Sequence, residues 1–209
     1  MTFSTRATGA ALALISGLFA PPALAEEVRD GVTFMGPLEP EGSQRRQMQE
    51  AIFDFAAAWA TCEPEFMERA LAEDVEFAYP TSVVNGAEAA LADLALFCDQ
   101  AENTSFYFPA DSFYIDEGVG RIAAEVQFRT FQRGARQVVN DVWIATVEDG
   151  RITILKEYLD GRVKDLQALG VLELEESPES LTPWPPRTAE WEDCFPIVRA
   201  APINQCPAE

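Results

Sequence analysis

The sequence contains no histidine, and its 15 basic residues are far outnumbered by 35 acidic residues. Without an imidazole, mechanisms of the Ser-His-Asp and Cys-His types are excluded. A zinc site of the usual Cys/His type is disfavoured as well, because no Cys-x-x-C pair occurs. We therefore expect no metal and no cofactor, and any acid–base chemistry must come from Asp, Glu, Tyr, Lys or a thiol.

Basic residues are also not clustered, since they occur singly or in pairs such as Arg45-Arg46. Binding to nucleic acid requires clustered Lys and Arg that contact phosphates. The net charge of −20 is instead typical of a solvated surface that keeps a protein soluble. We expect no nucleic-acid partner.

Long apolar runs are absent beyond the N-terminus. Arg6, the apolar run from Gly9 to Ala20 and the small-x-small pattern Ala23-Leu24-Ala25 predict a signal peptide over residues 1–25. The apolar run of about 12 residues is shorter than the roughly 20 that span a bilayer. We therefore expect no membrane span, cleavage before Glu26, and a periplasmic or secreted protein.

Four cysteines are present, and an even count in an oxidising compartment favours disulfides. Cys62 and Cys98 end the first and third predicted helices and could bridge them. Cys194 and Cys206 could close a short loop near the C-terminus. Three pairings exist in principle, and we predict these two bridges.

The pattern of apolar residues changes along the chain. Residues 26–41 contain glycines and prolines and predict an extended lead-in. Apolar residues at three- and four-residue steps predict a helix after a cap at Ser43. A second helix is predicted from Pro64, and a third after the Asn85-Gly86 turn.

Strands are predicted where the pattern alternates. They cover residues 75–79, 104–116 with a break near Pro109, 120–131, 135–147 and 151–160, and a last short helix is predicted over residues 162–169. This order predicts an α+β fold in which three N-terminal helices pack on a curved antiparallel sheet. A domain is predicted over residues 42–170, followed by a Pro-rich, Cys-containing C-terminal extension over residues 171–209.

Several segments resemble one known family. The segments are FDFAAAW at 53–59, ALAEDVEF at 70–77, VWIATVEDGRI at 142–152 and the EYLD that ends at Asp160. In this order, they resemble SnoaL-like proteins of the nuclear transport factor 2-like superfamily. The resemblance covers residues 44–168 and implies a cone-shaped fold whose sheet curls around a pocket closed by helices.

The superfamily includes limonene epoxide hydrolase-like enzymes, ketosteroid isomerases, polyketide cyclases and members without known catalysis. Asp160 matches the last-strand Asp of the epoxide hydrolases, but the middle strand, EVQFRTF at 125–131, lacks their Arg-x-Asp. The first-helix tyrosine of the isomerases is absent, since Phe53, Phe55 and Trp59 occupy that helix. The His of the cyclases is absent too.

Alternation groups the polar strand residues into candidate pocket faces. Lys156, Tyr158 and Asp160 share one face of the last strand. Glu125, Gln127 and Arg129 share one face of a middle strand. If these faces enter the pocket, the two carboxylates would have raised pKa values and could serve as general acid or base. Alternatively they meet solvent or a subunit interface, while the apolar residues between them enter the pocket.

Other candidates have alternatives of their own. Phe55, Trp59 and Tyr79 are predicted to form the pocket wall, and Tyr79 is also a candidate proton donor. Asn140 and Asp141 lie on opposite faces of one strand, so only one of them enters the pocket. Asp160 either enters the pocket or caps the helix predicted to begin near residue 162.

Two functional hypotheses remain open. One is an exported binding or accessory protein whose pocket holds a small, largely apolar molecule and whose sheet could support a homodimer. The other is a cofactor-free lyase, isomerase or hydrolase that uses Asp160 with Tyr79, Asp141 or Glu125. Two or more buried ionisable groups facing one cavity would favour the enzyme.

Overall fold

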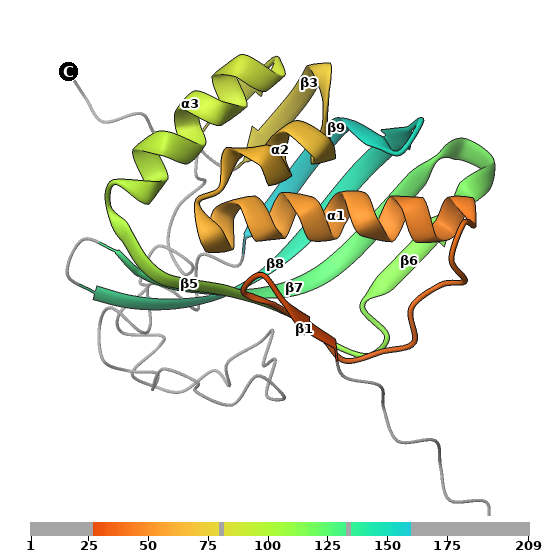
Figure 1. Cartoon of the computed structure of the whole chain (residues 1–209), viewed down its shortest axis with the longest axis horizontal. Coiled ribbons are helices and arrows are strands. Elements are labelled where there is room, and N and C mark those ends of the chain that lie inside the picture. The colour runs from red at the N-terminus through yellow and green to blue at the C-terminus, as the bar shows by residue number, and fades with distance from the viewer. Residues whose placement is uncertain (1–26, 80–81, 133–134, 160–209) are drawn as a thin grey trace, which may run out of the picture.

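The computed structural model describes residues 27–79, 82–132 and 135–159 (Figure 1). The predicted signal peptide, the last helix at 162–169 and the C-terminal extension lie outside these ranges. Within them, the elements in chain order are β1 Glu27–Arg29, β2 Val32–Phe34, α1 Gln44–Thr61, α2 Pro64–Ala70, β3 Leu71–Tyr79, β4 Ser82–Asn85, α3 Ala87–Cys98, β5 Ala101–Phe108, β6 Phe113–Asp116, the 3₁₀ turn η1 Glu117–Val119, β7 Arg121–Gln132, β8 Ala135–Glu148 and β9 Arg151–Leu159.

The helices begin at the residues that the sequence indicates. The Ser43 side chain accepts a hydrogen bond of 3.0 Å from the backbone N–H of Arg46 and caps α1, and Pro64 is the first residue of α2. Gly86 precedes α3 with a φ of +87°, which a glycine adopts without strain. None of the helices in the described ranges is long and apolar enough to cross a membrane.

The sheet is mixed, with the strand order β1-β2-β5-β7-β8-β9-β3-β4 and β6 paired with β7. The pairs β2–β5 and β3–β9 are parallel, so the prediction of an antiparallel sheet is wrong at these two places. The predicted lead-in also contains two strands, because β1 and β2 form a hairpin that joins the sheet. Strands of three or four residues, including β4, are too short to show an alternating pattern.

The long strands agree with the alternating pattern. The break expected near Pro109 separates β5 from β6. From there β7, β8 and β9 form a continuous antiparallel meander in which all of β7 pairs with residues 135–146 of β8. This meander forms the centre of the sheet.

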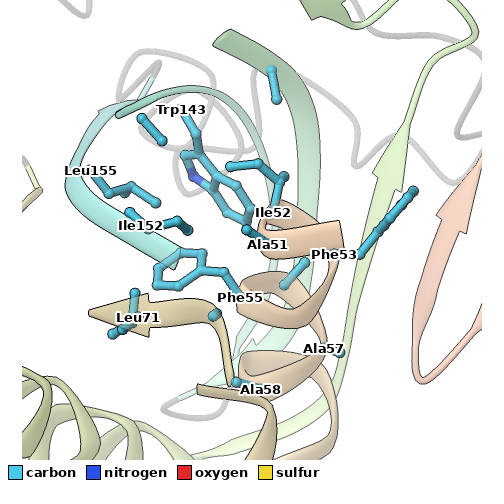
Figure 2. Packing of buried hydrophobic residues seen from close by; sticks show 14 of the residues in the cluster. Ala51, Ile52, Phe53, Phe55, Ala57, Ala58, Leu71, Trp143, Ile152 and Leu155 are labelled. Atoms are coloured by element: carbon cyan, nitrogen blue, oxygen red, sulfur yellow. The ribbon is translucent and has the colours of Figure 1, made fainter. Parts of the chain in front are cut away.

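The three α-helices lie on one side of the curved sheet, which buries the core between them (Figure 1). Phe55 of α1 packs edge-to-face against Trp143 of β8, with ring centroids 5.2 Å apart. Leu71, Ile152 and Leu155 surround this contact and are at most 1% exposed (Figure 2). Burial of such side chains contributes about 1.5–3 kcal/mol each, so this aromatic contact is central to the stability of the domain.

A disulfide joins Cys62 to Cys98, with their Cα atoms 5.9 Å apart. It confirms the predicted bridge between the first and third helices. Cys62 caps the C-terminal end of α1 and Cys98 ends α3. The neighbouring side chains Trp59 and Phe97 pack edge-to-face at 5.2 Å. The bridge therefore holds together two helix ends that also form one end of the cavity described next.

Candidate functional site: an aromatic pocket with a buried carboxyl pair

A cavity of about 630 Å³ lies between the helices and the inner face of the sheet. Helix α1 contributes Phe55 and Trp59, and α3 contributes Asp93, Leu96 and Phe97. The strands contribute the remaining described lining residues, which are mostly aromatic or amide side chains: Phe77, Tyr79, Phe106, Phe128, Gln132, Gln137, Val139, Trp143, Glu157 and Leu159, with Gln100 from the turn after α3. The cavity is thus apolar around its walls and carries a few polar groups.

Strand alternation and register explain which strand residues line the cavity. On β8, Gln137, Val139 and Trp143 line it, and Asp141 shares their face. Trp143 is directly opposite Glu157 of β9, and Asp141 is directly opposite Leu159. Asp141 and Glu157 are therefore diagonal neighbours on the inner face.

These two carboxyl groups perturb each other. Burial raises the pKa of Asp141 well above its usual value, and the charge and hydrogen bonding of Glu157 raise it further. Burial also raises the pKa of Glu157, against the opposing effects of the Trp143 indole and of Asp141. Together the pair retains a proton at pH values at which two separate exposed carboxyls would both be ionised.

Two polar atoms at this position are buried without a hydrogen-bond partner in the described part of the chain. They are Oδ1 of Asp141, whose residue is 4% exposed, and Nε1 of Trp143, whose residue is 2% exposed. The indole N–H is close enough to Glu157 to lower the pKa of that carboxyl. Because an unpaired buried polar atom costs about 1–3 kcal/mol, such atoms are expected where a ligand binds or reacts.

A second polar pair begins next to Glu157, because β3 pairs in parallel with β9 and Ala78 is opposite Lys156. The Tyr79 hydroxyl donates a hydrogen bond of 2.8 Å to Oδ2 of Asp93. Burial raises the pKa of Tyr79, and the hydrogen bond to Asp93 raises it further. The pair connects β3 to α3 and places a tyrosine hydroxyl and a second carboxylate on the lining of the same cavity.

Glu125, Gln127 and Arg129 lie on the other face of β7, away from the cavity. Arg129 donates to Gln127 at 2.7 Å, and Gln127 donates to Asn140 of β8 at 3.4 Å. Glu125 is exposed and accepts a hydrogen bond from Tyr114. The apolar residues of β7 that alternate with these three point inward instead and pack in the aromatic core.

On β9 the inner face is the opposite of the one expected. Tyr158 is 56% exposed and Lys156 is exposed, while Glu157 lines the cavity. The cause is a bulge: Ile152 pairs with Val147 and Ile154 with Thr146, so Thr153 is an extra residue on β9. The bulge shifts the inner face by one residue. Asp160 lies outside the described residues.

The structure places Phe55, Trp59 and Tyr79 on the cavity lining and Asp141, rather than Asn140, on the inner face. Glu157 and Asp93 were not among the candidates. A signal for Glu157 was present, because it is the charged residue in the otherwise apolar alternating set Leu155, Glu157 and Leu159. Asp93 gave no signal, since an acidic residue on a helix normally faces solvent.

A curved sheet around an aromatic cavity closed by helices defines a class of small α+β pocket domains. No family model matches the sequence, and no curated protein matches it. Many solved structures match the fold. An epoxide hydrolase of the limonene epoxide hydrolase type from M. tuberculosis has a TM-score of 0.52 at 17% identity, covering 59% of this chain and 90% of the other.

Two further structures give the same result. A putative SnoaL-like polyketide cyclase from Shewanella denitrificans has a TM-score of 0.52 at 11% identity, covering 59% of this chain and 97% of the other. TsrD from Streptomyces laurentii has a TM-score of 0.50 at 20% identity, covering 61% and 98%. The chain thus has the same fold as these SnoaL-like and epoxide hydrolase structures, as its motifs predict. Structural similarity at these sequence identities shows the fold only. The reaction has to be inferred from the residues of the site.

Proposed function

We propose that this domain binds a small, largely apolar molecule in its pocket and acts on it as a cofactor-free acid–base enzyme, a lyase, isomerase or hydrolase. The observation that carries the proposal is the Asp141–Glu157 pair at the aromatic cavity. Buried ionisable groups that share one cavity are characteristic of catalytic sites. Proteins of similar fold include epoxide hydrolases and polyketide cyclases.

Glu157 is the proposed catalytic residue because its carboxyl lines the cavity. A general acid or base works best when its pKa lies near the working pH, and burial shifts Glu157 in that direction. Asp141 is more deeply buried and acts through Glu157 as a positioning residue. Its hydrogen bond lowers the pKa of Glu157 and so favours the ionised carboxylate, which is the form that accepts a proton, and the proton that the pair shares is available to a leaving group.

A hydrogen-bond donor and an acceptor complete the proposed site. The unpaired indole N–H of Trp143 can stabilise negative charge that develops on a substrate oxygen. On the neighbouring strand β3, Tyr79 is held by its hydrogen bond to Asp93 and offers its hydroxyl oxygen as an acceptor to a bound molecule. A substrate held between these groups would meet a base and a donor at the same time.

The role of Asp160, as a catalytic residue or as a helix cap, stays a prediction. Asp160→Asn would remove a base while preserving shape, so turnover of an identified substrate should fall by roughly 10²-fold or more if Asp160 is catalytic. If Asp160 caps a helix, Asn should replace it without loss, and Asp160→Ala should cost about 1 kcal/mol of unfolding free energy. The two substitutions therefore separate the roles.

A binding or accessory protein is the second candidate. It is favoured by the middle strand 125–131, which lacks the Arg-x-Asp of the epoxide hydrolases, and by the apolar side chains Phe55 and Trp59 that α1 directs at the cavity. In this case the carboxyl pair would select the ligand without reacting with it.

One experiment distinguishes the two candidate functions. The protein is incubated in D₂O with a panel of small apolar ketones, epoxides and esters, and binding and chemical change are both followed by NMR. We expect deuterium incorporation or conversion of at least one member, reduced roughly 10²-fold or more by Glu157→Gln. Glu148→Gln, at the exposed end of β8, is the matched control. Binding without any conversion would support the accessory role.

Export and self-association are part of the proposal. The Cys62–Cys98 disulfide is typical of proteins outside the cytoplasm, in agreement with the signal pattern that ends at Ala25. The intact mass of the exported protein should correspond to a start at Glu26, and a product that retains residues 1–25 would contradict it. Light scattering should give the mass of a dimer if the sheet supports a homodimer.

A further inference from the structure

The described cavity lining has carboxyl groups without any basic partner. Asp93 and Glu157 line it, Asp141 lies on the same inner face, and no lysine or arginine is among the described lining residues. Lys156 and Arg129 are next in sequence to the lining residues Glu157 and Phe128, but they belong to the outer face of the sheet. The cavity therefore has a negative potential that nothing on its described surface balances.

Aromatic rings surround the same space from both layers. The aromatic cage comprises Phe55, Trp59, Phe77, Phe97, Phe106 and Phe128. Its rings meet at angles instead of lying flat on one another: Trp59 and Phe97 cross at 83°, and Phe55 and Phe77 at 86°. Ring faces carry the negative end of the aromatic quadrupole and attract cations. A cation that contacts the face of one of these rings would be attracted to it, in addition to its attraction to the carboxyl groups.

One atom of this arrangement lacks the partner that its chemistry requires. Oδ1 of Asp141 is buried and has no hydrogen-bond donor among the described residues. The side chain belongs to a residue only 4% exposed, so bulk water does not satisfy it. A donor or a positive charge brought in by a ligand would do so.

We propose that the pocket selects an organic cation, namely a small amine or quaternary ammonium compound with apolar substituents. The inference rests on the proposed function in one respect, that the pocket binds a small molecule. The positive nitrogen lies near Glu157 and Asp141, and the apolar groups fill the aromatic cage. An anion is excluded by the carboxyl groups, and a neutral molecule of the same shape gains only the apolar contacts.

The proposal has a consequence for pH. The ionisable groups that face Glu157 are Asp141 on β8 and Tyr79 on β3, the latter hydrogen-bonded to Asp93 on α3. A cation favours the ionised form of the carboxyl pair, so its binding displaces the shared proton. Its affinity should therefore rise as pH increases through the titration of the pair, whereas the affinity of a neutral molecule should not.

Three probes of nearly equal shape test the proposal on the full chain. They are phenyltrimethylammonium, its neutral isostere tert-butylbenzene, and the anion 4-tert-butylbenzoate, each measured by ligand-observed NMR and calorimetry at physiological salt. We expect the cation to bind at least ten-fold more tightly than either of the others. Its affinity should increase from pH 5 to pH 8.

Matched variants localise the effect. Glu157→Gln should reduce the preference for the cation over the neutral isostere to about three-fold or less, whereas Glu148→Gln, which removes the same charge from the exposed end of β8, should retain it. If Glu157→Gln fails to fold, Trp59→Leu serves instead, with Phe131→Leu on the outer face as its control. Trp59→Leu should weaken cation binding several-fold, and Phe131→Leu should not.

The outcomes separate this inference from the proposed function. Equal affinity for the cation and the neutral isostere, or a preference for the anion, would overturn the cation proposal and leave the pocket as a binding site. Equal loss of cation affinity in Glu157→Gln and Glu148→Gln would also overturn it, because the attraction would then come from the net charge of the protein. If no probe binds, both the cation proposal and the small-molecule pocket are wrong.

Discussion

The strands β7, β8 and β9 form both an inner and an outer face of the sheet. Polar residues have different surroundings on these two faces. On the outer face, Arg129, Gln127 and Asn140 form a chain of hydrogen bonds across two strands. On the inner face, Asp141 and Glu157 are surrounded by aromatic rings, and both have raised pKa values. Polar residues of the outer face hydrogen-bond one another, whereas Oδ1 of Asp141 and Nε1 of Trp143 on the inner face are buried without a partner among the described residues.

This difference shows which polar groups indicate a site. Polar residues at alternate positions, such as Glu125, Gln127 and Arg129, form one polar face of a strand and can hydrogen-bond one another, as Arg129 and Gln127 do. A lone carboxyl between apolar neighbours is costly and needs a reason. The inner face therefore carries the candidate chemistry, although the outer face has more polar residues.

The largest contrast between the faces should appear in stability. Trp143→Ala removes a side chain that is 2% exposed and contacts Phe55, Phe106 and Phe108. We expect a loss of about 3–5 kcal/mol in unfolding free energy, measured by urea denaturation. Tyr158→Ala, on the outer face at 56% exposure, should change it by less than about 0.5 kcal/mol. Equal losses would show that the outer face is packed as tightly as the core.

The disulfide should have the next largest effect. Replacement of both Cys62 and Cys98 by Ala removes a cross-link between residues 36 positions apart and should cost about 2–4 kcal/mol in urea denaturation. Because the bridge holds Trp59 against Phe97, binding of phenyltrimethylammonium should weaken as well. If stability falls while binding is unchanged, the cavity wall does not depend on the bridge.

The carboxyl pair should make stability depend on pH. The native pKa of Asp141 is raised, so between the unfolded and native values the native state binds more protons, and stability falls as pH rises. At pH values below the unfolded pKa the pair imposes no such cost. Asp141→Asn should flatten this fall and increase stability at neutral pH relative to wild type. An unchanged pH profile in denaturation experiments would contradict the raised pKa.

The smallest effect is expected on the outer face. Glu125 is exposed and makes a hydrogen bond of 3.2 Å to the Tyr114 hydroxyl. Glu125→Gln preserves an acceptor for that hydroxyl, so the unfolding free energy should change by less than about 0.5 kcal/mol. A larger loss would mean that the outer face has a charge requirement of its own.

The sequence determines the elements whose patterns are long enough to read. Helix α1 follows from apolar residues at helical spacing and the Ser43 cap, and β7, β8 and β9 follow from alternation and turn residues. The bridge between Cys62 and Cys98 follows from their positions at two helix ends. The helix and the three strands depend on residues close in the chain, and the bridge, which joins positions 36 apart, depends on where two helices end. The family motifs indicate the same fold.

The tertiary structure alone decides the short parallel pairings, the inner face of β9 and the composition of the site. Three-residue strands such as β2 are stabilised by their partner β5 and have no pattern of their own. The bulge at Thr153 reverses the face that simple alternation assigns to Tyr158 and Glu157. Asp141 meets Glu157, and Tyr79 meets Asp93, because strand register and helix packing bring together residues that are distant in sequence. No local pattern encodes such contacts, since their free energy arises only when both partners are buried in one cavity.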